Sequence, residues 1–179
     1  SAVKGLDILT RAFAELSRSL SDIKLVIVGP DDGYLSSLKA LITELKIGDK
    51  VLLPGPLWGE EKLQAYVDSD VYVLPSLYDW FPLTVLEALA CGLPVIISDR
   101  CGIAGAVDGK TGLSFHYDDK EQLKQALALL AKKARRLLDA LLGAVLGLCQ
   151  FLDALLSALL GFRQFLDHTL QFVELNFGD

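Results

Sequence analysis

Short apolar runs alternate with helix-patterned segments along residues 6 to 131, and this order restricts the fold more than any other feature. Each run has strand length and is bounded by glycine, proline or small polar residues, whereas the longer segments place apolar residues at steps of three and four. The expected strands cover residues 23–28, 50–53, 71–74, 94–97 and 112–115. The expected helices cover residues 6–20, 35–45, 59–67, a segment that begins after Pro82, and 118–131. Strands that alternate with helices predict right-handed βαβ units, and therefore an α/β fold with a Rossmann-like parallel sheet covered by helices on both faces.

The segment from Val71 to Ser98 joins two expected strands through a loop and a helix. Pro82 has the backbone angle suited to a first helical position, so the turn after it directs N–H groups and the positive end of the helix dipole at the loop. Asp79 precedes this turn, and Glu87 lies on the helix eight residues later. Because parallel sheets bind ligands at the carboxyl ends of their strands, the segment predicts an anion site between two carboxylates. Alternatively, the carboxylates only cap and solvate the helix.

The composition argues against several classes of protein. The net charge is −6 and no basic stripe occurs, whereas binding of nucleic acid requires clustered lysine and arginine. The cysteines Cys91, Cys101 and Cys149 are odd in number and lack metal-ligand spacing, so we expect a reduced, cytoplasmic chain without a structural metal. The chain opens on a helix rather than a strand, which indicates a piece of a longer protein.

From Leu137 onward the sequence becomes strongly apolar and repeats itself with a period of 14 residues, which places Asp139, Asp153 and Asp167 in equivalent positions. Fourteen residues are two heptads, so a helix would present the same apolar seam repeatedly. A membrane span is not expected, because Asp139 and Asp153 bound an apolar run of 13 residues whereas a bilayer requires ~20.

This change in composition divides the chain into a domain at residues 1–134 and an apolar helical tail at residues 135–179. Three interpretations of the tail stay open. It packs on the domain or on a neighbour, it derives from engineering, or it self-associates through residues 137–177.

Residues 79 to 96 resemble a motif of a known enzyme family. Asp79 and Glu87, followed by Ala88-Leu-Ala-Cys-Gly-Leu-Pro-Val-Ile, are similar to the Glu-x7-Glu motif and its continuation in retaining glycosyltransferases of the GT-B fold, the group 1 family. Further segments resemble the family's motifs in the family's order, at Lys4-Gly5 with the helix after it, residues 25–29, residues 51–55 and residues 108–113. The resemblance covers residues 4 to 131.

The resemblance implies a donor-sugar domain, one half of a GT-B enzyme that transfers a hexose from a nucleotide-diphosphate sugar with retention at the anomeric carbon. It also implies roles for the two carboxylates as catalytic residues. Glu87 would accept hydrogen bonds from the ribose hydroxyls of the nucleotide, and Asp79 would orient the donor sugar or stabilise positive character at its anomeric centre.

The resemblance further implies a set of residues that bind the diphosphate. These are Phe81 and Pro82 in the turn, the backbone N–H groups of Leu83 and Thr84, and Lys4 as the counter-charge of the leaving group. Because Lys4 and the helix terminus neutralise this charge, we expect neither a metal nor a cofactor, and the nucleotide sugar is a substrate.

The sequence also departs from the family pattern. Asp79 stands where the family has glutamate, and Gly105 stands where it commonly has glutamate too. The first strand of the domain and the N-terminal acceptor domain are absent from the sequence, so we expect this chain alone to be inactive. The parent protein then supplies the acceptor domain and any peripheral contact with a membrane. Two rival functions stay open, namely a non-catalytic nucleotide-binding module and an engineered or self-associating structural protein.

Overall fold

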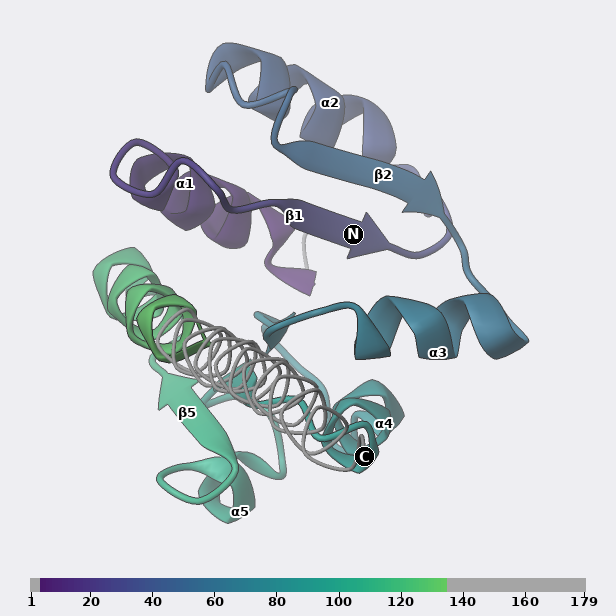
Figure 1. The fold of residues 1–179 in the computed structure, drawn as a ribbon, viewed down its shortest axis with the longest axis vertical. Helices are drawn as coiled ribbons and strands as arrows, with labels where there is room; N and C mark the ends of the chain where they lie inside the picture. Colours follow the sequence, from purple (N-terminus) through teal and green to yellow (C-terminus); the bar gives the residue numbers. More distant parts are fainter. Residues whose placement is uncertain (1–3, 135–179) are drawn as a thin grey trace, which may run out of the picture. The chain divides into compact units, whose positions relative to one another are not determined.

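The computed structural model describes residues 4–134 (Figure 1). The strands are β1 (Leu25–Val28), β2 (Val51–Gly55), β3 (Tyr72–Leu74), β4 (Val95–Ser98) and β5 (Gly112–Phe115). The helices are α1 (Leu6–Leu16), α2 (Leu35–Glu44), α3 (Gly59–Val67), α4 (Leu83–Ala90) and α5 (Ala104–Val107), and residues 120–134 are also helical. The predicted apolar tail at residues 135–179, with its repeat and its self-association seam at 137–177, lies outside the described residues.

One helix boundary and one short helix differ from the prediction for local reasons. The first helix ends at Leu16 rather than near residue 20, because the hydroxyls of Ser17 and Ser19 donate to the carbonyls of Ala14 and Leu16 and compete with the helical ladder. The short helix α5 was not predicted, since its four residues are too few to show a helical period. None of the helices within residues 4–134 is long and apolar enough to cross a bilayer.

The strands form two parallel sheets. In one, β1 lies beside β2 (Figure 1). The other has the strand order β3-β4-β5. In the larger sheet Tyr72 of β3 lies opposite Val95 of β4, which in turn lies opposite Gly112 of β5. Helices alternate with all of these strands along the chain. The α/β class with parallel strands is therefore confirmed.

The central strand β4 contributes to two separate cores because its side chains alternate between the faces of the sheet. Val95 and Ile97 pack on one face with residues of α3, α4 and α5, whereas Ile96 packs on the other face with α1 and the helix at 120–134. All four residues of β4 are buried. A third core places Phe13 of α1 and residues of α2 against the sheet formed by β1 and β2.

Gly5 fixes the start of α1 against the loop that follows β3. Its φ of 63° lies in the left-handed region, and a Cβ added there would lie 1.9 Å from the carbonyl oxygen of Pro75. Only glycine permits this approach of two backbones. As a result Lys4, one residue before Gly5, lies beside the loop that carries Asp79.

Candidate functional site

The loop between β3 and α4 ends at Pro82, which has an extended backbone with φ −71° and ψ 101°. The φ of Pro82 suits a first helical position, but its ψ is not helical, so Pro82 is the cap and α4 begins after it at Leu83, as the sequence predicted. The carbonyl of Pro82 accepts a hydrogen bond from the N–H of Val85. Within residues 4–134 no side chain caps this end of α4, so the N–H groups of Leu83 and Thr84 are available as donors for an outside acceptor. The neighbouring Phe81 side chain is exposed.

Asp79 meets Lys4 at this loop. The Nζ atom of Lys4 lies 3.3 Å from Oδ2 of Asp79, although the two residues are far apart in the sequence. The backbone of Asp79 is held separately, because its carbonyl accepts a hydrogen bond of 3.0 Å from the N–H of Gly102. The structure thus brings together two of the residues that the sequence predicted for the site. The Lys4 side chain is about half exposed, so its ammonium keeps access to a further anion.

Glu87 lies on α4 and has both carboxylate oxygens engaged by residues of α3. Nζ of Lys62 lies 2.7 Å from Oε1, and the hydroxyl of Tyr66 donates to Oε2 over 2.9 Å. The hydrogen bond from Lys62, followed by that from Tyr66, holds the pKa of Glu87 below its usual range. Glu87 is therefore a fixed carboxylate at neutral pH.

Sequence reasoning missed Lys62 and Tyr66, because they precede Glu87 by 25 and 21 residues. One signal was present in the sequence. Lys62 and Tyr66 are four residues apart and so share one face of the predicted helix 59–67. Nothing in that spacing says which helix the face meets, so the partner carboxylate required the structure.

Thr84, another predicted site residue, has a partner in β3. The hydroxyl of Tyr72 donates to Oγ1 of Thr84 over 2.8 Å. The rings of Tyr72 and Tyr66 pack edge to face with centroids 5.8 Å apart. Two tyrosine hydroxyls from adjacent rings therefore reach residues 84 and 87, which lie on the same side of α4.

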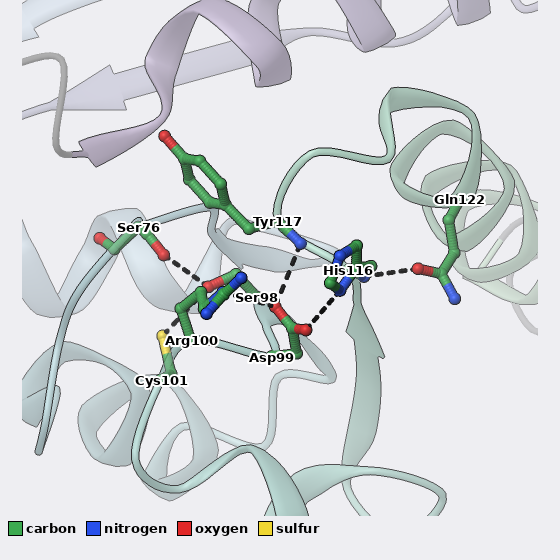
Figure 2. A network of polar contacts seen from close by, with 8 residues as sticks. All are labelled: Ser76, Ser98, Asp99, Arg100, Cys101, His116, Tyr117 and Gln122. Carbon is green, nitrogen blue, oxygen red and sulfur yellow. Dashed lines mark hydrogen bonds and ion pairs between the residues drawn. The ribbon is translucent and has the colours of Figure 1, made fainter.

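A second polar network joins the carboxyl ends of the larger sheet (Figure 2). Asp99 follows β4 and accepts from His116 Nδ1 at 2.6 Å and from the N–H of Tyr117 at 3.1 Å, so it ties β4 to the residues after β5. Burial opposes the ionisation of Asp99, but these two hydrogen bonds outweigh it and hold its pKa below the usual range.

The same network reaches the end of β3. The hydroxyl of Ser98 donates to the carbonyl of Ser76, as Figure 2 shows. The hydroxyl of Ser76 is itself buried and lacks a hydrogen-bond partner within residues 4–134. The partner of His116 in this network is Asp99.

Comparison with known proteins decides the family. Residues 1–140 match the model of the family described as glycosyl transferases group 1. The chain belongs to this family. The predicted resemblance to the group 1 family is therefore confirmed over residues 1–140, and the GT-B fold type and the glycosyltransferase class are supported by the relatives described next.

Curated relatives with known names match this chain over its first part. The D-inositol 3-phosphate glycosyltransferase of Acidothermus cellulolyticus is 34% identical over 137 residues, which are 72% of this chain and 31% of that protein. The GDP-mannose-dependent alpha-(1-6)-phosphatidylinositol monomannoside mannosyltransferase of Mycolicibacterium smegmatis is 31% identical over 141 residues, or 74% of this chain and 37% of that protein. The chain thus spans about a third of the length of the curated relatives it matches.

Solved structures agree on the fold. Sucrose-phosphate synthase from Thermosynechococcus elongatus superposes with a TM-score of 0.66 at 29% identity, covering 75% of this chain and 35% of that chain. A glycosyltransferase from Rickettsia africae gives a TM-score of 0.67 at 23% identity, covering 74% of this chain and 35% of that chain. The architecture of residues 4–134 is therefore that of part of a glycosyltransferase fold.

Proposed function

We propose that this chain binds a nucleotide-diphosphate sugar and forms the donor half of a retaining glycosyltransferase. One observation carries the proposal. Along the chain the N-terminus of α4, which no side chain within residues 4–134 caps, lies between Asp79 and Glu87, and each of these carboxylates has a lysine beside it. N–H donors and a cation suit a diphosphate, and a fixed carboxylate suits sugar hydroxyls. The name of the GDP-mannose-dependent relative supports the same class of substrate.

The proposed diphosphate site uses the turn at Phe81 and Pro82. The N–H groups of Leu83 and Thr84 donate to the phosphate oxygens, and the dipole of α4 adds to the attraction. Lys4 offsets the negative charge that builds up on the phosphate as the bond to the sugar breaks. A metal is not required for this neutralisation, and no cofactor enters the proposal.

The proposed sugar and ribose contacts use the two carboxylates. Glu87 accepts hydrogen bonds from the ribose hydroxyls, while Asp79 faces the donor sugar and stabilises positive charge at the anomeric carbon. The bonding electrons leave with the nucleoside diphosphate, the acceptor hydroxyl adds to the same face of the sugar, and its proton passes to the departing phosphate oxygen. Because a nucleoside diphosphate leaves readily, this step needs no carboxylic acid to protonate it, in contrast to glycoside hydrolysis.

The chain alone is proposed to bind donor without transferring sugar. The acceptor site is assigned to an N-terminal domain of the parent protein, which also makes any peripheral contact with a membrane. We place the protein in the cytoplasm, because Cys91 and Cys101 form no disulfide within residues 4–134 and a reducing compartment preserves such thiols.

Calorimetry tests the donor site. UDP, GDP, ADP and their glucose or mannose conjugates are titrated into the chain, and we expect one base to bind. Glu87→Ala then weakens that binding at least tenfold, whereas Glu121→Ala, which removes an exposed carboxylate from the helix at 120–134, leaves it unchanged. If no nucleotide binds, or if both variants behave alike, the donor-site proposal is wrong.

A non-catalytic nucleotide-binding module is the second candidate. The observation that favours it is Asp79, which is one methylene shorter than glutamate and is paired with Lys4. Product analysis of the full-length parent with each sugar nucleotide separates the two candidates. Only an enzyme releases one nucleoside diphosphate for each acceptor molecule that it glycosylates. Self-association through residues 137–177 stays a prediction, and light scattering on the chain truncated after Ala134 tests it.

A further inference from the structure

Helix α3 presents a cation and a hydroxyl to Glu87 of α4. Lys62 contacts Oε1 at 2.7 Å and Tyr66 donates to Oε2 at 2.9 Å. The body of Tyr66 is buried in the same core as Val85 and Ala88 of α4, so its hydroxyl cannot swing away from the helix. The two contacts thus fix the direction of the Glu87 carboxylate before any ligand arrives.

The contacts leave the Glu87 carboxylate able to accept more hydrogen bonds. A carboxylate offers about four lone-pair sites, two on each oxygen. Lys62 and Tyr66 take one site on each oxygen. One site therefore remains on each oxygen, which matches the two hydroxyls of a ribose cis-diol. The hydrogen bond from Lys62 is also the main cause of the lowered pKa of that carboxyl.

Without these contacts Glu87 would sample several rotamers, and a ligand would have to order it on binding. Ordering a glutamate side chain loses conformational entropy and so opposes binding, and fixing the side chain in advance therefore favours binding. Tyr72 provides a natural comparison. Its hydroxyl is carried by the adjacent ring but reaches Thr84 instead of Glu87.

We propose that Lys62 and Tyr66 are positioning residues that orient Glu87 for the ribose cis-diol of a nucleoside diphosphate. This inference rests on the proposed function, in which Glu87 contacts the ribose. Lys62 and Tyr66 act through Glu87, so their contribution depends on the ribose hydroxyls and disappears when those hydroxyls are absent.

The test compares UDP, GDP and ADP with their 2′,3′-dideoxy counterparts by calorimetry on the whole chain. In Lys62→Met and Tyr66→Phe the Kd of the ribonucleotide that binds rises about 3- to 10-fold, the size expected for one lost hydrogen bond. The Kd of its dideoxy counterpart changes by less than about twofold. Tyr72→Phe, the matched control, affects both nucleotides equally because its hydroxyl does not reach Glu87.

If Tyr66 acts through Glu87, the double variant Glu87→Gln with Tyr66→Phe binds the ribonucleotide as tightly as the single variant Glu87→Gln. Equal losses for ribo and dideoxy nucleotides, or tighter binding by Lys62→Met, would overturn the inference. Binding that needs Glu87 but ignores Lys62 and Tyr66 overturns this inference alone. Absence of binding by the unchanged chain overturns the proposed function as well. Thermal unfolding of each variant confirms that it is folded.

Discussion

Asp79 and Glu87 occupy matching positions in one motif, yet the structure supports them differently. Asp79 lies in a loop and contacts one lysine, Lys4, through an exposed pair at 3.3 Å. Glu87 lies on a helix and has both oxygens held by α3, at 2.7 and 2.9 Å. A carboxylate with one exposed partner can exchange that partner for a ligand, whereas one with two partners is preset. In the proposed function, the exchangeable partner of Asp79 suits a donor sugar that moves during the reaction, and the fixed carboxylate of Glu87 suits a ribose that stays in place.

The largest effect on the free energy of unfolding is expected at Gly5, whose close backbone contact with Pro75 brings Lys4 to Asp79. Gly5→Ala places a Cβ 1.9 Å from the Pro75 carbonyl and forces alanine into a left-handed backbone, so the free energy of unfolding falls by about 2 kcal/mol or more. Gly109→Ala is the matched control, because Gly109 has φ +69° but no atom within 4 Å of an added Cβ. Urea unfolding measures both. A loss no greater in Gly5→Ala than in the control would show that the contact with Pro75 is unimportant.

Removing each charge compares the two carboxylates directly. Glu87→Gln lowers the free energy of unfolding by about 1 kcal/mol at pH 7, because two hydrogen bonds to a charge are weakened. Asp79→Asn lowers the free energy of unfolding by less than about 0.5 kcal/mol, as expected for an exposed ion pair. This loss in Asp79→Asn vanishes in about 1 M salt, because salt screens the pair.

The loss in Glu87→Gln has a defined pH dependence. The folded pKa of Glu87 is depressed, so its stabilisation is fully present above the unfolded value of 4.5 and is lost as the pH falls through the folded pKa. The free energies of unfolding of the unchanged chain and of Glu87→Gln therefore become equal at acid pH. A difference between them that is constant from pH 7 to pH 3 would contradict the assignment.

The Asp99 network gives a comparison outside the motif. His116→Ala removes one of the hydrogen bonds to Asp99 and lowers the free energy of unfolding by about 0.5 kcal/mol at pH 7, because the pair is partly exposed. Binding of the nucleotide stays unchanged, since His116 contacts neither Asp79 nor Glu87 among the contacts in residues 4–134. Calorimetry and urea unfolding on the same sample check both statements. A change in nucleotide affinity would extend the site to β5.

The smallest effect is expected at Ser76. Its hydroxyl is buried without a partner within residues 4–134, so Ser76→Ala removes an unsatisfied group and raises the free energy of unfolding by roughly 0.5 kcal/mol. Ser98→Ala is the contrast, because its hydroxyl donates to the carbonyl of Ser76 and its loss is destabilising. A destabilised Ser76→Ala would indicate that the hydroxyl has a partner after all.

The sequence predicted those features that depend on local pattern. The strands, α2, α3 and the loop before α4 follow from apolar periodicity and from proline and glycine, and the structure places all of them near the expected residues. The sequence does not predict α5, because its four residues are too few to show a helical period. Nor does it predict that the strands separate into two sheets, since strand partners are set by the packing of the whole domain.

The site divides in the same way. Asp79, Glu87 and the turn between them were found because one contiguous motif carries them. The contact of Lys4 with Asp79 depends on Gly5 passing close to Pro75, a meeting of distant segments. Lys62 and Tyr66 were missed for the same reason, because the angle between α3 and α4 decides which side chains they meet.

The alternation along β4 has a consequence for how the domain opens. Val95 and Ile97 belong to one core and Ile96 to the other, so the amides of β4 are covered by both. Opening either face alone leaves the other cover in place. Exchange of the β4 amides with heavy water therefore requires the whole domain to unfold, and these amides report its global stability, while the loop before α4 exchanges through smaller local fluctuations.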